Sequence, residues 1–176
     1  MKRHPRSGNL DGSLQRLWAP WRHAYVAQPR KPGCIFCQAG RSRDDRGWLV
    51  VYRGRAVFGL LNLYPYNAGH LMVAVRRHVG TLSALKADEC RELLQVAALM
   101  ERRLTKLLRP DGFNVGINVG RSAGAGIPGH LHLHLVPRWS GDTNFMTVTG
   151  RVKVMVQSLD ALYDGLTRTR RTRARR

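Results

Sequence analysis

The chain has few acidic residues, few cysteines and no long apolar run, and each shortage excludes a class of protein. Asp and Glu together number 11 among 176 residues, against 30 Lys and Arg, so the formal net charge is +19. No apolar stretch approaches the roughly 18 residues of a membrane-spanning helix. No apolar core follows the basic N-terminus MKRHPRSGNLDGS, so it is no secretory signal, and three cysteines do not suit a disulfide framework. We therefore expect a soluble, cytoplasmic protein with no membrane partner.

The rest of the composition is that of one globular domain with charged ends. Hydrophobic residues make up 43% of the chain, enough for a buried core. The last nine residues, RTRRTRARR, contain six arginines, and no acidic residue follows Asp164. We expect a flexible basic arm over 1–12, a folded domain over 13–166 and a disordered Arg-rich tail over 167–176. The positive charge suits a polyanionic partner, either a nucleotide or a nucleic acid bound through the tail, and does not distinguish between them.

The order of strand-like and helical patterns predicts an α+β fold. Apolar residues recur at three- and four-residue spacing between Thr81 and Leu108 and predict a long helix, and a last helix is expected over 151–166. β-rich segments joined by tight turns predict a mostly antiparallel sheet of about five strands with helices packed on one face. The strands are expected at 48–53, 56–62, 70–75, 113–119 and 130–139.

The last of these strands carries three histidines in strict alternation. His130, His132 and His134 alternate with leucines, so the leucines face the core and the imidazoles line the opposite face. Such a row suits a transition-metal site, which would make the protein a metalloenzyme, or nucleophilic catalysis at phosphorus. The preceding loop, GRSAGAGIPG at 120–129, favours the second chemistry, because glycine and serine let backbone N–H groups approach an anion closely.

At these residues the sequence resembles the histidine triad (HIT) family, whose signature is His-φ-His-φ-His-φ-φ, with φ apolar. Residues 130–136 match this signature at every position. The resemblance covers about residues 14–160 and is closest to the branch that contains bacterial diadenosine tetraphosphate phosphorylases and related HIT hydrolases. It implies a HIT-like fold and makes the folded domain a HIT-like catalytic domain. Four further segments carry it: RLWAPWR at 16–22, NLYPYNAGH at 62–70, GFNVGINVG at 112–120 and PRWSGDTNFM at 137–146.

The resemblance implies cleavage of a dinucleoside polyphosphate at the α-phosphorus through a covalent nucleotidyl-histidine. His132 would be the nucleophile, with its other ring nitrogen held by a backbone carbonyl, and His134 would bind phosphate oxygens. His130 is the remaining histidine of the triad. Water or inorganic phosphate would then attack the intermediate, so the enzyme would be a hydrolase or a phosphorylase, and it needs no cofactor for catalysis.

The resemblance also assigns contacts with an adenine nucleotide. Asn62 would face the ribose, apolar residues near Leu60 would enclose the base, and Asn118 would donate to a phosphate oxygen. From the residues alone, Asn62 could instead be a turn former and Asn118 an ordinary strand end, while His70 suits a buried histidine that supports the site. The phosphate loop is assigned three residues, Ser122, Gly124 and Gly126.

A C-x-x-C pair, Cys34 and Cys37, precedes the predicted sheet. A thioredoxin-like redox role needs a βαβ context that the sequence lacks. Zinc needs two further ligands, and His78 and His130 are candidates. Zinc-containing members of the family use a similar set of two cysteines and two histidines, which implies a structural zinc here. The alternative is a pair of plain reduced thiols.

Proteins of this family are commonly dimers joined through their helices, so the resemblance implies a homodimer. The alternative to an enzyme is a nucleotide- or RNA-binding protein that acts through its basic surface and tail.

Overall fold

The structure is a computed structural model that describes residues 33–143 and 157–173 of the chain. The chain divides into two units, Met1–Lys31 and Pro32–Arg176, and every described residue belongs to the second. The expected N-terminal arm, the RLWAPWR segment and the first part of the last expected helix lie outside the described residues.

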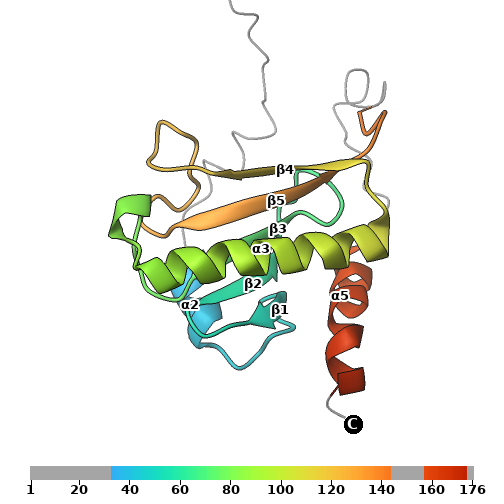
Figure 1. The fold of residues 1–176 in the computed structure, drawn as a ribbon, viewed down its shortest axis with the longest axis horizontal. Helices are drawn as coiled ribbons and strands as arrows, with labels where there is room; N and C mark the ends of the chain where they lie inside the picture. The colour runs from blue at the N-terminus through green and yellow to red at the C-terminus, as the bar shows by residue number, and fades with distance from the viewer. Residues whose placement is uncertain (1–32, 144–156, 174–176) are drawn as a thin grey trace, which may run out of the picture. The chain divides into compact units, whose positions relative to one another are not determined.

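Five antiparallel strands form one sheet in the order β1-β2-β3-β5-β4. Figure 1 shows β4 and β1 at the two edges of this sheet, with helix α3 running across one of its faces. The predicted α+β fold with about five antiparallel strands is confirmed. The strands are β1 (Val50–Arg53), β2 (Val57–Leu61), β3 (Leu71–Val75), β4 (Gly112–Ile117) and β5 (His132–Arg138).

Strand β5 begins later than the histidine pattern predicted. His130 lies just before the strand, because its backbone N–H donates to the carbonyl of Ile127 and that of Leu131 donates to the carbonyl of Val79. The first amide is engaged within the turn and the second by the segment that follows β3, so neither residue is part of the ladder between β3 and β5. The alternation of side chains nevertheless continues through Leu131, which is buried with the core leucines.

The sheet has apolar side chains on both faces. Strands β2 and β3 are buried at every position, which explains why they read as continuous apolar runs and not as alternating ones. One set of side chains packs under the long helices and the other lies on the face that carries His132 and His134. The first set includes Val57, Leu61, Leu71, Val73, Val75, Leu131, Leu133 and Leu135, and the second includes Phe58, Leu60, Met72 and Ala74.

Two long helices cover the first of these faces. Helix α3 (Ala87–Leu108) contacts β2, β3 and β5, and helix α5 (Leu159–Arg173) contacts α3 and β1. Helix α3 ends at Leu108, and the capping residue Arg109 takes a left-handed conformation with φ of 50° before Pro110. Helix α5 continues past residue 166 to Arg173, so the first part of the Arg-rich segment is helical in this structure.

A short helix, α2 (Ile35–Arg41), lies on the opposite face of the sheet and was not predicted from the sequence. Phe36 and Ala39 of α2 are buried against Phe58, Leu60 and the other side chains of that face. The expectation that the helices share one face therefore holds for α3 and α5 alone. Seven residues are too few to show a helical repeat, which is why the pattern gave no sign of α2.

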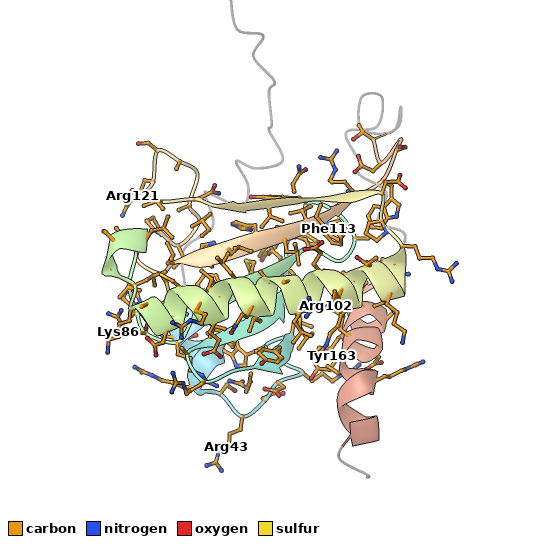
Figure 2. All side chains as sticks on the ribbon, viewed as in Figure 1. Arg43, Lys86, Arg102, Phe113, Arg121 and Tyr163 are labelled. Atoms are coloured by element: carbon orange, nitrogen blue, oxygen red, sulfur yellow. The ribbon has the colours of Figure 1, made fainter. Side chains whose placement is uncertain are left out.

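The described surface is strongly basic. In Figure 2, Arg43, Lys86, Arg102 and Arg121 project outward from different parts of the domain. Among the residues that the structure describes, no helix has the length and apolar character needed to cross a membrane.

The packing of α3 on the sheet gives a direct test of the core. Leu104 has no exposed surface, so Leu104→Ala should lower the free energy of unfolding by about 2–5 kcal/mol through the cavity that it leaves. Gln95 on the same helix is exposed, and Gln95→Ala should change the stability by less than about 0.5 kcal/mol. Denaturant unfolding of both variants measures the difference, and equal losses would contradict this packing.

Candidate active site

The histidine row lies on the sheet face opposite α3. His132 and His134 follow each other on this face of β5, with their ring centroids 4.8 Å apart. His132 is 4% exposed and His130 is 1% exposed, so two of the three rings are almost fully removed from water. The predicted separation of leucines and imidazoles onto opposite faces is what the structure shows.

Hydrogen bonding fixes the tautomer of His132. Its Nδ1 lies 2.8 Å from the backbone carbonyl oxygen of His130, which can only accept, so Nδ1 carries the proton. The Nε2 atom of neutral His132 therefore keeps its lone pair. Burial lowers the pKa of His132, and the hydrogen bond to the His130 carbonyl partly opposes this shift. A buried, neutral imidazole with a free Nε2 is the state that a nucleophile requires.

His70 orients the third histidine of the row. The backbone N–H of Tyr66 donates to His70 Nδ1 over 3.1 Å, which places the His70 proton on Nε2. His70 Nε2 then donates to His134 Nδ1 over 2.9 Å, so neutral His134 carries its own proton on Nε2. Burial, together with the neighbouring His134 and His132 rings, lowers the pKa of His70 to about 3 from its ordinary 6.5. His70 is thus a neutral, buried donor that holds His134 as a donor.

Asn62 belongs to the same network. Its Oδ1 accepts the backbone N–H of Tyr64 over 3.0 Å, and its Nδ2 lies 3.2 Å from His70 Nδ1. The side chain is therefore engaged both as a turn former and as a partner of His70. Leu60, expected near the base, is 5% exposed and packs with the apolar side chains next to the histidines.

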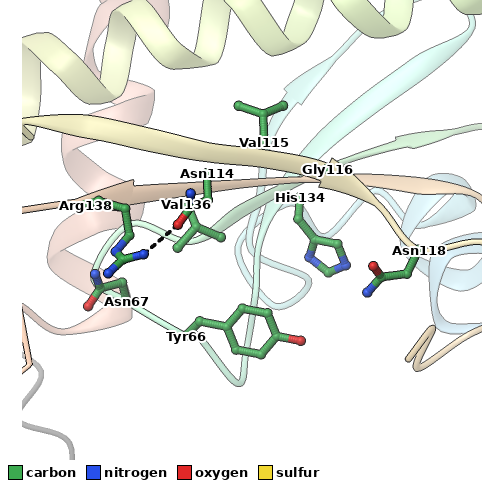
Figure 3. Close-up of a pocket in the computed structure, with 9 residues that line it drawn as sticks. All are labelled: Tyr66, Asn67, Asn114, Val115, Gly116, Asn118, His134, Val136 and Arg138. Carbon is green, nitrogen blue, oxygen red and sulfur yellow. Dashed lines mark hydrogen bonds between the residues drawn. The ribbon is translucent and has the colours of Figure 1, made fainter. Parts of the chain in front are cut away.

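A cavity of about 400 Å³ opens beside His134. Figure 3 shows that the Asn118 amide and the Tyr66 ring lie next to the His134 ring, while Arg138 and Asn67 lie at the other end. Asn118 therefore lines the cavity beside His134, and no hydrogen-bond partner is found for its amide among the described residues. The full lining comprises Tyr66, Asn67, Asn114, Val115, Gly116, Asn118, His134, Val136 and Arg138.

The glycine-rich loop leads into the histidine row but does not line this cavity. Gly124 has a φ of 83°, and its N–H donates to the carbonyl of Arg121. The N–H of Ala125 donates to the carbonyl of Gly120, so two amides of the loop are engaged within it. Ser122 is exposed. The structure therefore does not bring Ser122, Gly124 and Gly126 into the lining of the His134 cavity.

The four predicted metal ligands converge at the other end of the row. The ligand atoms of Cys34, Cys37, His78 and His130 all lie within 4.8 Å of one another. His130 Nδ1 is 3.3 Å from Cys34 Sγ, 3.5 Å from Cys37 Sγ and 3.3 Å from His78 Nδ1. Ligands around a tetrahedral zinc lie about 3.3–3.8 Å apart, given its bond lengths to sulfur and nitrogen. The donor types and spacing therefore fit zinc.

His130 is also in the tautomer that such a site needs. Its Nε2 donates to the carbonyl oxygen of Val75 over 2.7 Å, which leaves the lone pair on Nδ1, the atom that faces the two thiols. The same residue supplies the carbonyl that holds His132. His130 thus joins the cysteine cluster to the candidate nucleophile.

Two aromatic residues at the site were missed by the sequence analysis. Phe36, between the two cysteines, has its ring centroid 5.2 Å from that of His130 and 4.5 Å from that of His132. Tyr66 lies 4.7 Å from His70 and 6.1 Å from His134 by the same measure. The position of Phe36 inside the C-x-x-C pair was the one available signal for it, and nothing in the sequence marked Tyr66.

The burial of His70 predicts a pH dependence of stability. The unfolded chain protonates His70 near pH 6.5, whereas the folded protein resists protonation until about pH 3, so stability is lost as the pH falls through this range. His70→Gln removes this titration. Between pH 7 and pH 5 the variant should therefore lose about 1–2 kcal/mol less unfolding free energy than the wild type. Denaturant unfolding at both pH values measures the slopes, and equal slopes would show that His70 is not held neutral.

Comparisons with known proteins agree with this geometry. The HIT domain family model matches residues 47–141. The AP-4-A phosphorylase of Mycobacterium tuberculosis is 46% identical over 155 residues, which cover 83% of this chain and 79% of that protein. A bis(5'-adenosyl)-triphosphatase of Saccharomyces cerevisiae is 35% identical over 91 residues, covering 51% of this chain and 44% of that protein.

A solved structure supports the fold independently. A zinc-bound histidine triad family protein from Mycobacterium smegmatis superposes with a TM-score of 0.64 at 23% identity, covering 82% of this chain and 98% of that one. Because the family model spans more than half of the chain and includes the whole histidine row, the chain belongs to the HIT domain family.

Proposed function

We propose that the protein is a HIT-family enzyme that cleaves dinucleoside polyphosphates at the α-phosphorus. The observation that carries this proposal is the His132 ring, whose Nδ1 is tied to the His130 carbonyl and whose Nε2 lone pair is left free. The relatives named AP-4-A phosphorylase and bis(5'-adenosyl)-triphosphatase support the substrate class, because both names refer to adenosine polyphosphates.

In the first step, His132 Nε2 attacks the α-phosphorus and forms a P–N bond. The P–O bond to the rest of the polyphosphate breaks, and the leaving oxygen departs with the bonding electron pair as an ionised phosphate. The His132 ring becomes a cation that keeps its Nδ1 proton, and the His130 carbonyl stabilises this charge through the existing hydrogen bond. His134 Nε2–H donates a hydrogen bond to a phosphate oxygen and keeps its proton, because His70 already donates to Nδ1.

In the second step, water or inorganic phosphate attacks the same phosphorus and the P–N bond breaks. The proton of the attacking oxygen is released to solvent as the product phosphate ionises. The electron pair returns to His132 Nε2, which restores the neutral ring. Asn118 supplies an amide donor to the phosphate from the end of β4, where it lies beside His134 (Figure 3). We assign the remaining substrate contacts as the resemblance implies them: Leu60 near the base, Asn62 at the ribose, and Ser122, Gly124 and Gly126 at the phosphates.

Turnover of diadenosine tetraphosphate tests this function. Products should be ADP and ATP where inorganic phosphate is the acceptor, and AMP and ATP where water is. His132→Ala should reduce turnover by at least about 1,000-fold, because the covalent route is lost, while the circular dichroism spectrum stays unchanged. Chromatography of the products with and without phosphate measures both. Wild-type protein that cleaves neither this substrate nor a simple adenylyl ester would contradict the proposal.

We also propose that the cysteine cluster holds a structural zinc. Cys34, Cys37, His78 and His130 would ligate it, and the metal would fix α2 and Phe36 against the histidine row. The zinc-bound Mycobacterium smegmatis protein of the same fold supports this reading. At this position zinc would supply stability, and the proposed reaction is carried by side chains alone.

Metal analysis and thermal unfolding test the zinc site with a matched pair of variants. Cys34→Ser removes a ligand and should abolish the bound zinc and lower the melting temperature by about 5 °C or more. Cys90→Ser changes an exposed thiol on α3 and should retain one zinc per chain and the wild-type melting temperature. If the two variants keep the same metal content, the cluster is a pair of thiols and two histidines without zinc.

A homodimer is part of the same proposal. Leu94 on α3 and Val115 on the edge strand β4 are large apolar side chains that are 64% and 54% exposed in the single chain. Exposed apolar side chains on a helix and on an unpaired strand edge support association of two copies.

A further inference from the structure

A glycine faces the catalytic row across the strands. The register pairs Leu60 with Met72, Met72 with His134, and His134 with Gly116, so four strands contribute one line of residues on the histidine face. Leu60 and Met72 fill their part of this line with buried side chains. Next to His134 the line ends in a residue with no side chain, and the cavity lies there.

Within the described part of a single chain, no neighbouring atom requires a glycine at position 116. A Cβ atom at Gly116 would meet no atom within 4 Å, so no neighbour excludes a larger residue. Gly116 does not have a positive φ, so the backbone does not demand it either. Glycine in a strand interior weakens the strand and often marks a place where a ligand comes close. Because Gly116 has no side chain, a space remains beside His134 that no described side chain fills.

The residues that line the cavity beside His134 suit a polar, aromatic group. The Tyr66 ring is 48% exposed and lies close to parallel to the His134 ring, at an angle of 24°. Asn118 contributes an amide at one end of the cavity. At the other end Arg138 is held in place, because Asp142 accepts from its guanidinium and its Nη1 donates to Asn114 Oδ1 over 2.6 Å.

We propose that the space over Gly116 receives the leaving group of the substrate, with Gly116 as the residue that sets how large this group can be. The inference rests on the proposed function and names the subsite for its second nucleotide. An attacking nitrogen and a departing oxygen lie on opposite sides of phosphorus, so the leaving polyphosphate needs space away from His132. The cavity beside His134 and Gly116 provides this space. The Tyr66 ring forms a stacking wall for the second base.

Two substrates with the same adenylyl group and different leaving groups test this assignment. Diadenosine tetraphosphate loses a nucleoside triphosphate, whereas adenosine 5'-phosphorofluoridate loses a single fluoride, and neither leaving group needs a proton. Gly116→Val should lower kcat/KM for diadenosine tetraphosphate on the order of tenfold or more, and Gly116→Ala by less. Both variants should keep kcat/KM for the fluoridate within about twofold and should not lower the melting temperature.

Gly112 provides the matched control. It lies on the same strand, its Cβ would also meet nothing within 4 Å, and it is absent from the cavity lining. Gly112→Val should leave kcat/KM for both substrates unchanged. Equal losses on both substrates in the Gly116 variants, or no loss on either, would overturn the subsite while wild-type turnover still upheld the proposed function. Wild-type protein that cleaves neither substrate would overturn both.

Discussion

The hydrogen bond from His132 Nδ1 to the His130 carbonyl is the interaction on which the site depends. It sets which nitrogen of His132 is free, and the carbonyl is itself fixed because the His130 side chain is held at both ring nitrogens. Nε2 is bonded to the Val75 carbonyl on β3, and Nδ1 faces the cysteine cluster. The proposed nucleophile, His132, is therefore oriented by the sheet on one side and by α2 with its cysteines on the other.

The two ends of the histidine row are held by different means. At the His130 end, thiols and imidazoles converge with the spacing of metal ligands, and Phe36 packs on the rings. At the His134 end, a buried neutral His70, itself held by the Tyr66 backbone N–H, donates to the ring, and the Tyr66 ring lies beside it. Burial lowers the pKa values of His70 and His132, which suits a row that is proposed to bind an anion without first forming ion pairs of its own.

The sequence predicted those parts of the structure that depend on the local periodicity of apolar and polar residues. Alternation with a period of two placed the histidines and leucines on opposite faces, and the three- and four-residue spacing predicted α3. The family resemblance brought Cys34, Cys37, His78 and His130 together, which spacing alone could not do. Helix α2 was not predicted because its seven residues are too few to show a helical periodicity of apolar residues. The tautomers and the room over Gly116 depend on contacts and register between distant strands, which no local pattern contains.

The configuration at phosphorus tests the central claim most directly. A substrate with a chiral α-phosphorothioate would be cleaved with inorganic phosphate as the acceptor, or in ¹⁸O-labelled water so that the product phosphorus is chiral, and the configuration of the product compared with that of the substrate. Transfer through a nucleotidyl-His132 involves two displacements, each of which inverts phosphorus, so the product should show net retention. Net inversion would mean that the acceptor attacks the substrate directly, and would contradict a covalent role for His132.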